Sequence, residues 1–202
     1  RGRSLPQRIV YISTSGVYGD CQGAMIDETR APRPDTARGI RRLDAERQLR
    51  AFGRRTGVAV GILRAPGIYA SDRLPVERLR KGTPALQAAD DVFTNHIHAD
   101  DLAAACCAAL QHARPNRAYN VTDDSQLQMG EYFDCVADTF GLPRPQRLSR
   151  DEAERVLPPM QLSFMRESRR LSNRRLKEEL RLRLAYPSVE EGIAAALKER
   201  KA

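Results

Sequence analysis

Apolar residues in the first third of the chain form two short continuous runs, separated by a longer amphipathic segment. The runs at Arg8–Thr14 and 58–63 have the composition of buried strands. Residues 36–57 between them have the spacing of a helix, and Gly57 is a suitable C-terminal stop. The apolar side of this helix is expected to hold Ile40, Leu43 and Phe52. The order predicts two parallel strands, neighbouring or nearly so in one sheet, joined by a right-handed helical crossover.

Strands and helices continue to alternate beyond this unit, after a long polar loop at 20–35. Predicted helices cover 75–82, 100–113 and 129–141, and predicted strands cover 92–98 and 117–121. Serine capping boxes at Ser149 and Ser188 mark two later helices, and another helix begins at Ser172 or Asn173. The pattern predicts an α/β protein with a parallel sheet and a helical C-terminal portion packed beside it.

Composition narrows the possible classes of protein. A chain of 202 residues is long enough for one domain with a real core. The net charge of +8 would suit nucleic acid, but the arginines are interspersed with acids, as in "RRLDAERQLR", which is typical of solvated helix faces. We expect no signal peptide, and the sequence contains no apolar run that could span a bilayer. The four cysteines fit no zinc pattern, so we expect reduced, buried thiols in a cytoplasmic protein.

Small hydroxyl residues stand where the first strand should end. The sequence "YISTSGVYGD" places Ser13, Thr14 and Ser15 before Gly16. Ligands of open α/β sheets bind beyond the carboxyl ends of the strands, so these residues are candidates for a site. The same residue types are also ordinary in turns, and the strand end alone leaves both interpretations open.

Seven stretches, in a constant order across nearly the whole chain, carry a family resemblance. They are "VYISTSGVYGD", "LDAE", "ILRAPGIY", "HIHADDLAAA", "AYNVTDD", "EYFDCVADTFGLPRP" and "SNRRLKEEL…YPSVEEGI". Together they resemble the C-terminal two thirds of an extended short-chain dehydrogenase/reductase of the NAD-dependent epimerase/dehydratase group. The last stretch resembles an atypical branch of mostly uncharacterised bacterial proteins.

The resemblance implies a partial Rossmann-type, doubly wound parallel sheet. Residues 1–70 would form the C-terminal portion of the dinucleotide-binding sheet with its crossover helix. Residues 71–202 would supply the final strands and a smaller, mostly helical substrate-binding part. The glycine-rich fingerprint G-x-G-x-x-G does not occur in the chain, which is therefore expected to begin after the first Rossmann half. NAD or NADP would bind the full-length protein, and this piece alone would bind it poorly.

The resemblance also assigns the residues nearest the cofactor. Thr14 takes the place of the hydroxyl residue that binds the substrate oxygen, and Ser13 lies beside it. The register set by "LDAE" puts Arg38 where the family has its catalytic tyrosine and Arg42 where it has the lysine. Arg42 would still offer a cation to a ribose or phosphate, whereas a guanidinium such as that of Arg38 stays protonated and is no general base. Both arginines also suit the solvated face of a basic helix.

Further contacts follow the second strand. In the family, the turn at Ala65 and Pro66 passes near the nicotinamide, and Tyr69 and His98 are candidate substrate contacts. The alternative for Tyr69 is a ring packed under the loop, and for His98 a structural His-x-Asp-Asp element at a helix start. His96 and His98 have no third ligand suitably spaced, so no metal site is predicted.

The function expected from this pattern is that of an NAD(P)-dependent epimerase/dehydratase-like oxidoreductase. Its substrate would be a small molecule or a nucleotide-sugar-like compound. Loss of the tyrosine–lysine pair leaves enzymatic activity open and favours, as an alternative, a non-catalytic NAD(P)-binding or regulatory protein. A nucleic-acid-binding module is a third interpretation, weakened by the absence of a clustered basic and aromatic stretch. We expect no nucleic-acid or membrane partner, and a homodimer is possible.

Overall fold

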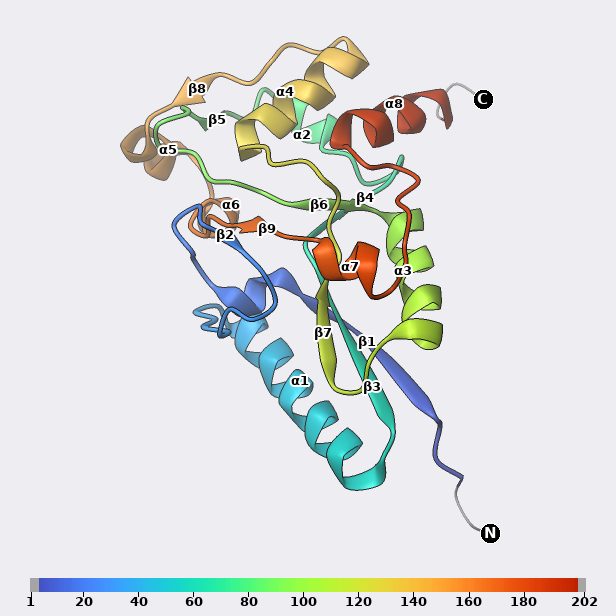
Figure 1. Ribbon diagram of the computed structural model, residues 1–202. Helices are drawn as coiled ribbons and strands as arrows, with labels where there is room; N and C mark the ends of the chain where they lie inside the picture. The colour runs from blue at the N-terminus through green and yellow to red at the C-terminus, as the bar shows by residue number, and fades with distance from the viewer. Residues whose placement is uncertain (1–3, 200–202) are drawn as a thin grey trace.

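The central sheet contains three parallel strands. The computed structural model describes residues 4–199. Strands β1 (Arg8–Thr14), β3 (Ala59–Ala65) and β7 (Arg117–Asn120) lie in the order β1-β3-β7 (Figure 1). In the register, Thr14 is opposite Ala65 and Arg64 is opposite Asn120, so the three strands end at the same edge. The predicted parallel pairing of the first two strands is confirmed.

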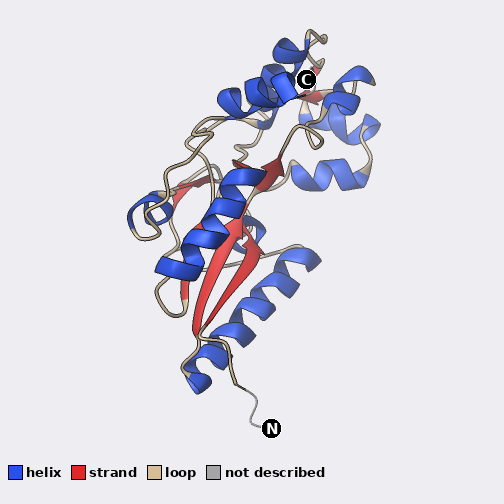
Figure 2. Cartoon of the chain, turned by 90° about the vertical axis from the view of Figure 1, so that its right-hand side faces the viewer, coloured by secondary structure: helices blue, strands red, loops and turns tan. Residues whose placement is uncertain are grey.

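Helices cover both faces of this sheet (Figure 2). On one face, α1 (Ala37–Thr56) packs Leu49 near Val60 and Ile62 of β3. On the other, α3 (Ala99–His112) packs its alanines against Leu63, in a second apolar core cluster. The alternation of β3 side chains between two apolar layers explains why its sequence is continuously hydrophobic.

Helix α1 begins and ends where the sequence predicts. The Thr36 side chain accepts a hydrogen bond from the Gly39 amide, and Gly57 adopts a left-handed conformation with φ of 77°. Gly39 is required for close packing, because a Cβ there would lie 2.9 Å from the Gly16 carbonyl oxygen. The start of α1 is thereby held against η1 (Ser15–Tyr18), the short 3₁₀ helix that follows β1.

The sheet-facing side of α1 differs from the predicted one. Leu43 is buried, but Ile40 is 52% exposed, so its predicted place on the apolar side is wrong. The buried side contains Glu46 and the glycines Gly39 and Gly53. Small residues let the helix approach the sheet closely, and Ile40 falls outside the narrow contact that results.

Three short pairs of parallel strands extend the structure beyond the central sheet. They are β2 (Met25–Ile26) with β9 (Arg170–Leu171), β4 (Gly67–Tyr69) with β6 (His96–His98), and β5 (Ala85–Leu86) with β8 (Arg147–Leu148). The strand predicted at 92–98 is thus reduced to its last three residues. Each pair joins segments far apart in sequence, so these pairings fix the C-terminal part against the sheet.

The C-terminal part is mostly helical, as predicted. Its helices are α2 (Val76–Arg80), α4 (Met129–Phe140), α5 (Arg150–Val156), α6 (Pro159–Phe164), α7 (Arg174–Glu178) and α8 (Val189–Glu199). The capping box at Ser149 is present, with Glu152 as its partner. Within the described residues, no helix combines the length and the apolar composition needed to cross a bilayer.

The cysteines are free thiols, but they are not all buried. Cys21 is buried, whereas Cys107 is exposed on α3, so the expectation of burial is wrong for that residue. Cys107 lies on the solvent-facing side of α3, together with the exposed residues Ala103, Ala104 and Leu110. Among residues 4–199, no cluster of three or more His, Cys, Asp or Glu side chains is placed to hold a metal ion.

Candidate functional site

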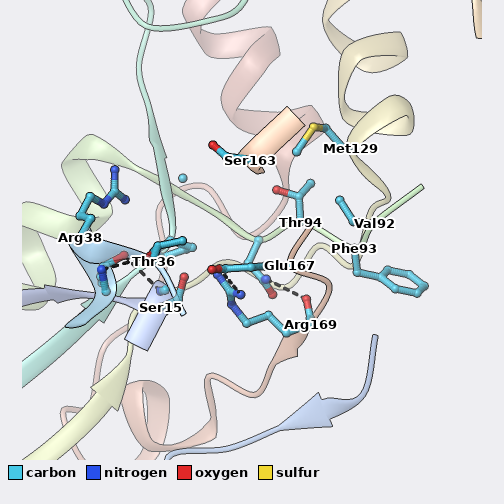
Figure 3. A pocket seen from close by; sticks show the side chains of 16 residues that line it. Ser15, Thr36, Arg38, Val92, Phe93, Thr94, Met129, Ser163, Glu167 and Arg169 are labelled. Atoms are coloured by element: carbon cyan, nitrogen blue, oxygen red, sulfur yellow. Dashed lines mark hydrogen bonds and ion pairs between the residues drawn. The ribbon is translucent and has the colours of Figure 1, made fainter. Parts of the chain in front are cut away.

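A cavity of about 330 Å³ lies at the carboxyl end of the central sheet (Figure 3). Its walls come from the end of β1 with η1, the first turn of α1, the turn after β3, the segment before β6, and the residues between α6 and β9. Segments widely separated in sequence therefore meet here, as expected for a ligand site of an open α/β sheet.

Thr14 and Ser15 supply hydroxyl groups to this cavity. Both residues are buried, and Thr14 Oγ1 accepts a hydrogen bond of 3.2 Å from the Gly16 amide. An oxygen that accepts this bond keeps its own O–H for another partner. Thr14 is therefore positioned to donate a hydrogen bond to an oxygen of a bound molecule.

The two arginines of α1 occupy different surroundings. Arg38 is exposed and lines the cavity. Arg42 lies one turn further along and outside the lining, where its guanidinium donates to the Tyr11 hydroxyl at 3.1 Å and to the Ile12 carbonyl at 3.3 Å. The chain thus presents a permanent cation at the cavity where a tyrosine was the family expectation.

Ser13 faces away from the cavity, into a buried network. Its hydroxyl donates to Glu46 Oε1 at 2.6 Å, and Arg64 binds both oxygens of the same carboxylate, at 3.1 and 2.7 Å. The Arg64 guanidinium lies 4.8 Å from the centre of the Tyr18 ring, and the Tyr18 hydroxyl donates to Asn120. We call these five residues, Ser13, Tyr18, Glu46, Arg64 and Asn120, the paired network.

The paired network keeps its charges although it is buried. Burial alone would lower the pKa of Arg64, but the hydrogen bond and charge of Glu46 raise it well above its usual value. Burial also raises the pKa of Tyr18, so this tyrosine stays protonated. The network ties α1 to β3 and β7 and so fixes where Arg38 and Thr14 meet the cavity.

Residues after β3 divide between the cavity and the core. Pro66 lines the cavity, whereas Ala65 is buried beside Thr14 in the strand register. Tyr69 and His98 are also buried, and neither lies on the cavity wall. His98 Nδ1 accepts from the Asp100 amide at 3.2 Å, which is the expected structural role at the start of α3.

Tyr69 belongs to a second buried group, which we call the histidine–aromatic cluster: Tyr69, His96, His98, Asp123 and Tyr132. The Tyr69 ring meets both histidine rings edge-on, and His96 stacks on Tyr132 with ring centres 4.0 Å apart. The cluster is sealed by α8, since a Cβ at Gly192 would overlap the Tyr69 ring. Asp123 donates its amide to the His96 carbonyl at 2.9 Å.

Burial neutralises the titratable groups of this cluster. It lowers the pKa of His96 to about 3 and raises that of Asp123 to about 8. His96 Nδ1 and Asp123 Oδ2 are buried without a hydrogen-bond partner in the described structure. Neutral His96 also lines a second cavity, of about 220 Å³, which shares Thr94 and Met129 with the first.

This second cavity is mainly apolar, with one guanidinium. Arg78 donates to Gln161 at 2.8 Å and to the Pro84 carbonyl at 2.6 Å, and it lies over the Phe133 ring. Burial lowers the pKa of Arg78, and no carboxylate in the described structure is paired with it. The two cavities adjoin each other, since Thr94 and Met129 line both.

Sequence reasoning missed the residues between α6 and β9. Glu167 and Arg169 reach the first cavity and point toward Ser15 and Thr36 (Figure 3). Glu167 Oε2 accepts from Arg169 at 2.7 Å, and burial raises the pKa of Glu167. Their stretch, "RESRR", has the appearance of a solvated charge run, and only the long-range pairing of β2 with β9 could have located it.

Comparison with known proteins gives a consistent result. The family model for the NAD dependent epimerase/dehydratase family matches residues 2–122. Protein YeeZ of Escherichia coli strain K12 is 30% identical over 139 residues, which are 69% of this chain and 48% of that protein. The chain therefore spans about half the length of this curated relative.

Two solved structures share both sequence and fold with the chain. A functionally unknown conserved protein from Silicibacter pomeroyi is 34% identical, with a TM-score of 0.85 over 96% of this chain and 67% of that one. A protein from Methylobacillus flagellatus, provisionally assigned as an NAD-dependent epimerase/dehydratase, is 31% identical, with a TM-score of 0.73 over 97% and 65%. These similarities extend over the whole described fold, including the C-terminal helices.

Proposed function

Because the chain belongs to the NAD dependent epimerase/dehydratase family, we propose that it forms the substrate-facing part of an NAD(P)-dependent oxidoreductase. The observation that carries the proposal is Thr14. Its hydroxyl stands in a cavity at the end of β1 with an O–H to donate, and Pro66, just after the strand partner of Thr14, lines the same cavity. This is the arrangement needed to hold the oxygen of a substrate alcohol or carbonyl.

The residues present fit the nicotinamide end of the dinucleotide. The cavity there is lined by the Thr14 hydroxyl, the Pro66 turn and the exposed cation Arg38, while Arg42 lies one helical turn away, outside the lining. When bound, the nicotinamide would accept or supply the hydride. The 202 residues contain no G-x-G-x-x-G turn for the pyrophosphate, so we expect this chain by itself to bind NAD(P) more weakly than micromolar.

The two adjoining cavities suggest how a substrate would lie. Its reacting oxygen would be near Thr14, and its remaining part would extend past Thr94 and Met129 toward Arg78. A nucleotide-sugar-like compound or another small anionic molecule suits a polar end followed by an apolar space with one guanidinium whose charge no carboxylate neutralises in the described structure.

One observation supports the non-catalytic alternative. Arg38 lines the cavity at the position of the expected tyrosine and remains protonated at any accessible pH. A protein that binds NAD(P) and does not turn it over would need no proton-transfer group there. Binding and turnover must therefore be measured separately.

The test uses the natural gene product that contains this chain. Binding of NADH and NADPH is followed by fluorescence, and turnover is followed by absorbance with a panel of nucleotide sugars and small alcohols. Binding with turnover supports the oxidoreductase, and binding alone supports the alternative. Absence of any binding would overturn both.

A further inference from the structure

The second cavity contains an arginine whose positive charge is not neutralised. Arg78, on α2, is half-buried and lines this cavity of about 220 Å³. Its guanidinium donates to the Gln161 side-chain oxygen at 2.8 Å and to the Pro84 carbonyl at 2.6 Å, and both acceptors are uncharged. Burial lowers the pKa of Arg78, as expected for a cation that no carboxylate of the described chain neutralises. The charge of Arg78 is therefore available to a bound molecule.

The guanidinium of Arg78 also has unused hydrogen-bond donors. An arginine carries five N–H donors, of which the bonds to Gln161 and Pro84 use two, one on each terminal nitrogen, so three remain without an acceptor among the described residues. One of the three is on Nε, which is buried and has no hydrogen-bond partner in the described structure. The guanidinium lies over the Phe133 ring, 4.7 Å from its centre. The side chain is thus held by two hydrogen bonds and a ring, with donors left for a ligand.

The other walls of the second cavity are suited to an apolar body. Met129, Tyr132, Phe133 and Met165 line it beside Arg78, and the two aromatic rings and Met165 are buried. The cavity is smaller than the roughly 300–1,000 Å³ of pockets that hold drug-sized ligands. It therefore has room for one ring or one short branched chain with a single charged substituent, and a whole nucleotide is too large for it.

A buried histidine in the same cavity adds no charge. His96 lines the cavity, and its Nδ1 has no hydrogen-bond partner in the described structure. Burial lowers the pKa of His96 to about 3, so the ring is neutral at neutral pH. Arg78 is therefore the one charged side chain among the described residues that line this cavity. One positive charge matches a singly charged carboxylate, whereas a phosphate dianion would leave a net negative charge in apolar surroundings.

We propose that the second cavity is a carboxylate subsite, in which Arg78 binds the carboxylate of a small substrate whose reacting hydroxyl or carbonyl lies near Thr14. The inference rests on the proposed function and narrows its substrate class to hydroxy or oxo carboxylic acids with an apolar or ring-shaped body. The two cavities share Thr94 and Met129, so one molecule of this kind extends from the first into the second. A planar carboxylate matches the fork of a guanidinium, which a lysine would not offer.

The first experiment tests the subsite without turnover. Met165 lines the second cavity and not the first, so its ¹³C-methyl signal in the 202-residue chain reports occupation of the subsite. The signal is assigned by its loss in Met165→Leu, and exposed Met25 is the internal control. The probes are phenylacetate, its neutral analogue phenylacetamide, and phenyl phosphate.

Phenylacetate should shift the Met165 signal saturably and leave that of Met25 unchanged. Phenylacetamide should bind about tenfold more weakly or worse, because it lacks the charge that strengthens hydrogen bonds to a guanidinium. Phenyl phosphate should also bind more weakly than phenylacetate, because one of its two charges stays uncompensated. Equal affinity for the acid and the amide, tighter binding of the phosphate ester, or no saturable shift with phenylacetate would each overturn the carboxylate subsite.

Variants of α2 assign the affinity to one side chain. Arg78→Gln should weaken phenylacetate about tenfold or more and leave phenylacetamide unchanged. Arg78→Lys keeps the charge without the fork, so it should fall between the parent protein and Arg78→Gln, and it decides the matter if Arg78→Gln does not fold. Arg80→Gln, at an exposed arginine of the same helix, is the matched control and should change neither probe. Undiminished phenylacetate binding in both Arg78 variants would contradict the role of Arg78.

The second experiment asks whether the subsite serves the reaction. In the natural gene product, NAD(P)-dependent turnover of a panel of hydroxy carboxylic acids is compared with turnover of their primary amides. Arg78→Gln should raise KM for the acids roughly tenfold or more with little change in kcat, because a contact remote from the reacting oxygen is made equally before and in the transition state. Its effect on the amides should be small. A merely structural role of Arg78 would affect acids and amides alike.

The outcomes separate this inference from the proposed function. If the parent protein turns over NAD(P) with other compounds and shows no preference for acids over amides, the carboxylate subsite is wrong and the oxidoreductase stands. If the parent protein shows no turnover, the proposed function fails and the substrate-binding role of Arg78 falls with it. The Met165 titration then still decides whether the second cavity binds a carboxylate.

Discussion

The protein buries polar groups in two regions, by opposite means. In the paired network, Glu46 and Arg64 stay charged, because each neutralises the other at 2.7 Å. In the histidine–aromatic cluster, His96 and Asp123 lie among rings without a partner of opposite charge, and burial shifts each pKa toward the neutral form. The free energy of unfolding should therefore fall when a charged partner is removed from the paired network. In the histidine–aromatic cluster, its contribution should change with pH.

The largest expected effect breaks the paired network. Glu46→Gln removes the charge that compensates buried Arg64 and should lower the free energy of unfolding by about 3–5 kcal/mol. Urea denaturation at pH 7 measures the loss. Glu154→Gln, exposed on α5, is the control and should change stability by less than about 0.5 kcal/mol.

A double variant sharpens this result. Glu46→Gln combined with Arg64→Met removes both charges and should recover part of the stability that the single change loses. If Glu46→Gln costs less than about 1 kcal/mol, the carboxylate is not the partner on which buried Arg64 depends. The contrast between the two regions would then be lost.

The network also shows what the sequence could and could not predict. Strand β1 and the caps Thr36 and Gly57 follow from local patterns, because strand composition and capping residues act on their immediate neighbours. Burial of Glu46 does not, since a glutamate on an arginine-rich helix has the appearance of a solvated residue. Only the position of Arg64, in another element, makes that burial tolerable.

The same distinction holds at the candidate site. Thr14 and Pro66 line the cavity, and both positions follow from a local signal at a strand end together with a family resemblance, although their roles stay predictions. Glu167 was missed, because its place depends on the pairing of two-residue strands β2 and β9, more than 140 residues apart. Such short pairings leave almost no periodicity in the sequence.

The next prediction concerns His96 and acid. The folded protein holds His96 neutral down to about pH 3, whereas the unfolded chain protonates it near 6.5. The unfolded state therefore binds more protons in this window, and stability falls as the pH falls through it. His96→Phe keeps the stacking on Tyr132. Between pH 7 and 4, the variant should lose roughly 3 kcal/mol less of its free energy of unfolding than the parent protein does. Urea denaturation at each pH measures the difference.

Asp123 should give the opposite slope. Its carboxyl stays protonated when folded up to about pH 8, whereas the unfolded chain loses that proton near 3.9. Stability therefore falls as the pH rises between these values. Asp123→Asn should remove roughly 2–3 kcal/mol of this loss between pH 5 and 7, with exposed Asp72→Asn as control.

The His96 and Asp123 contributions change stability in opposite directions between about pH 4 and 6.5. They therefore partly cancel in the parent protein. Each single variant should reveal the slope of the remaining residue: His96→Phe should become less stable as the pH rises, and Asp123→Asn less stable as it falls. Two variants with parallel pH profiles would contradict neutralisation by burial and would make the cluster resemble the paired network.

The smallest expected effect concerns activity, at the cavity at the carboxyl end of the central sheet, which neither region lines. Thr14→Val keeps the shape of the side chain and removes the hydroxyl that would hold the substrate oxygen. In the natural gene product it should lower kcat/KM about tenfold, equivalent to one hydrogen bond of about 1.4 kcal/mol. Arg38→Ala should have a smaller effect, and that effect should appear in KM, because a permanently protonated group binds charge without moving a proton. Steady-state kinetics across pH distinguishes the two. Loss of turnover in Arg38→Ala with full activity in Thr14→Val would reverse the roles, because the chemistry would then depend on the start of α1 and not on the end of β1.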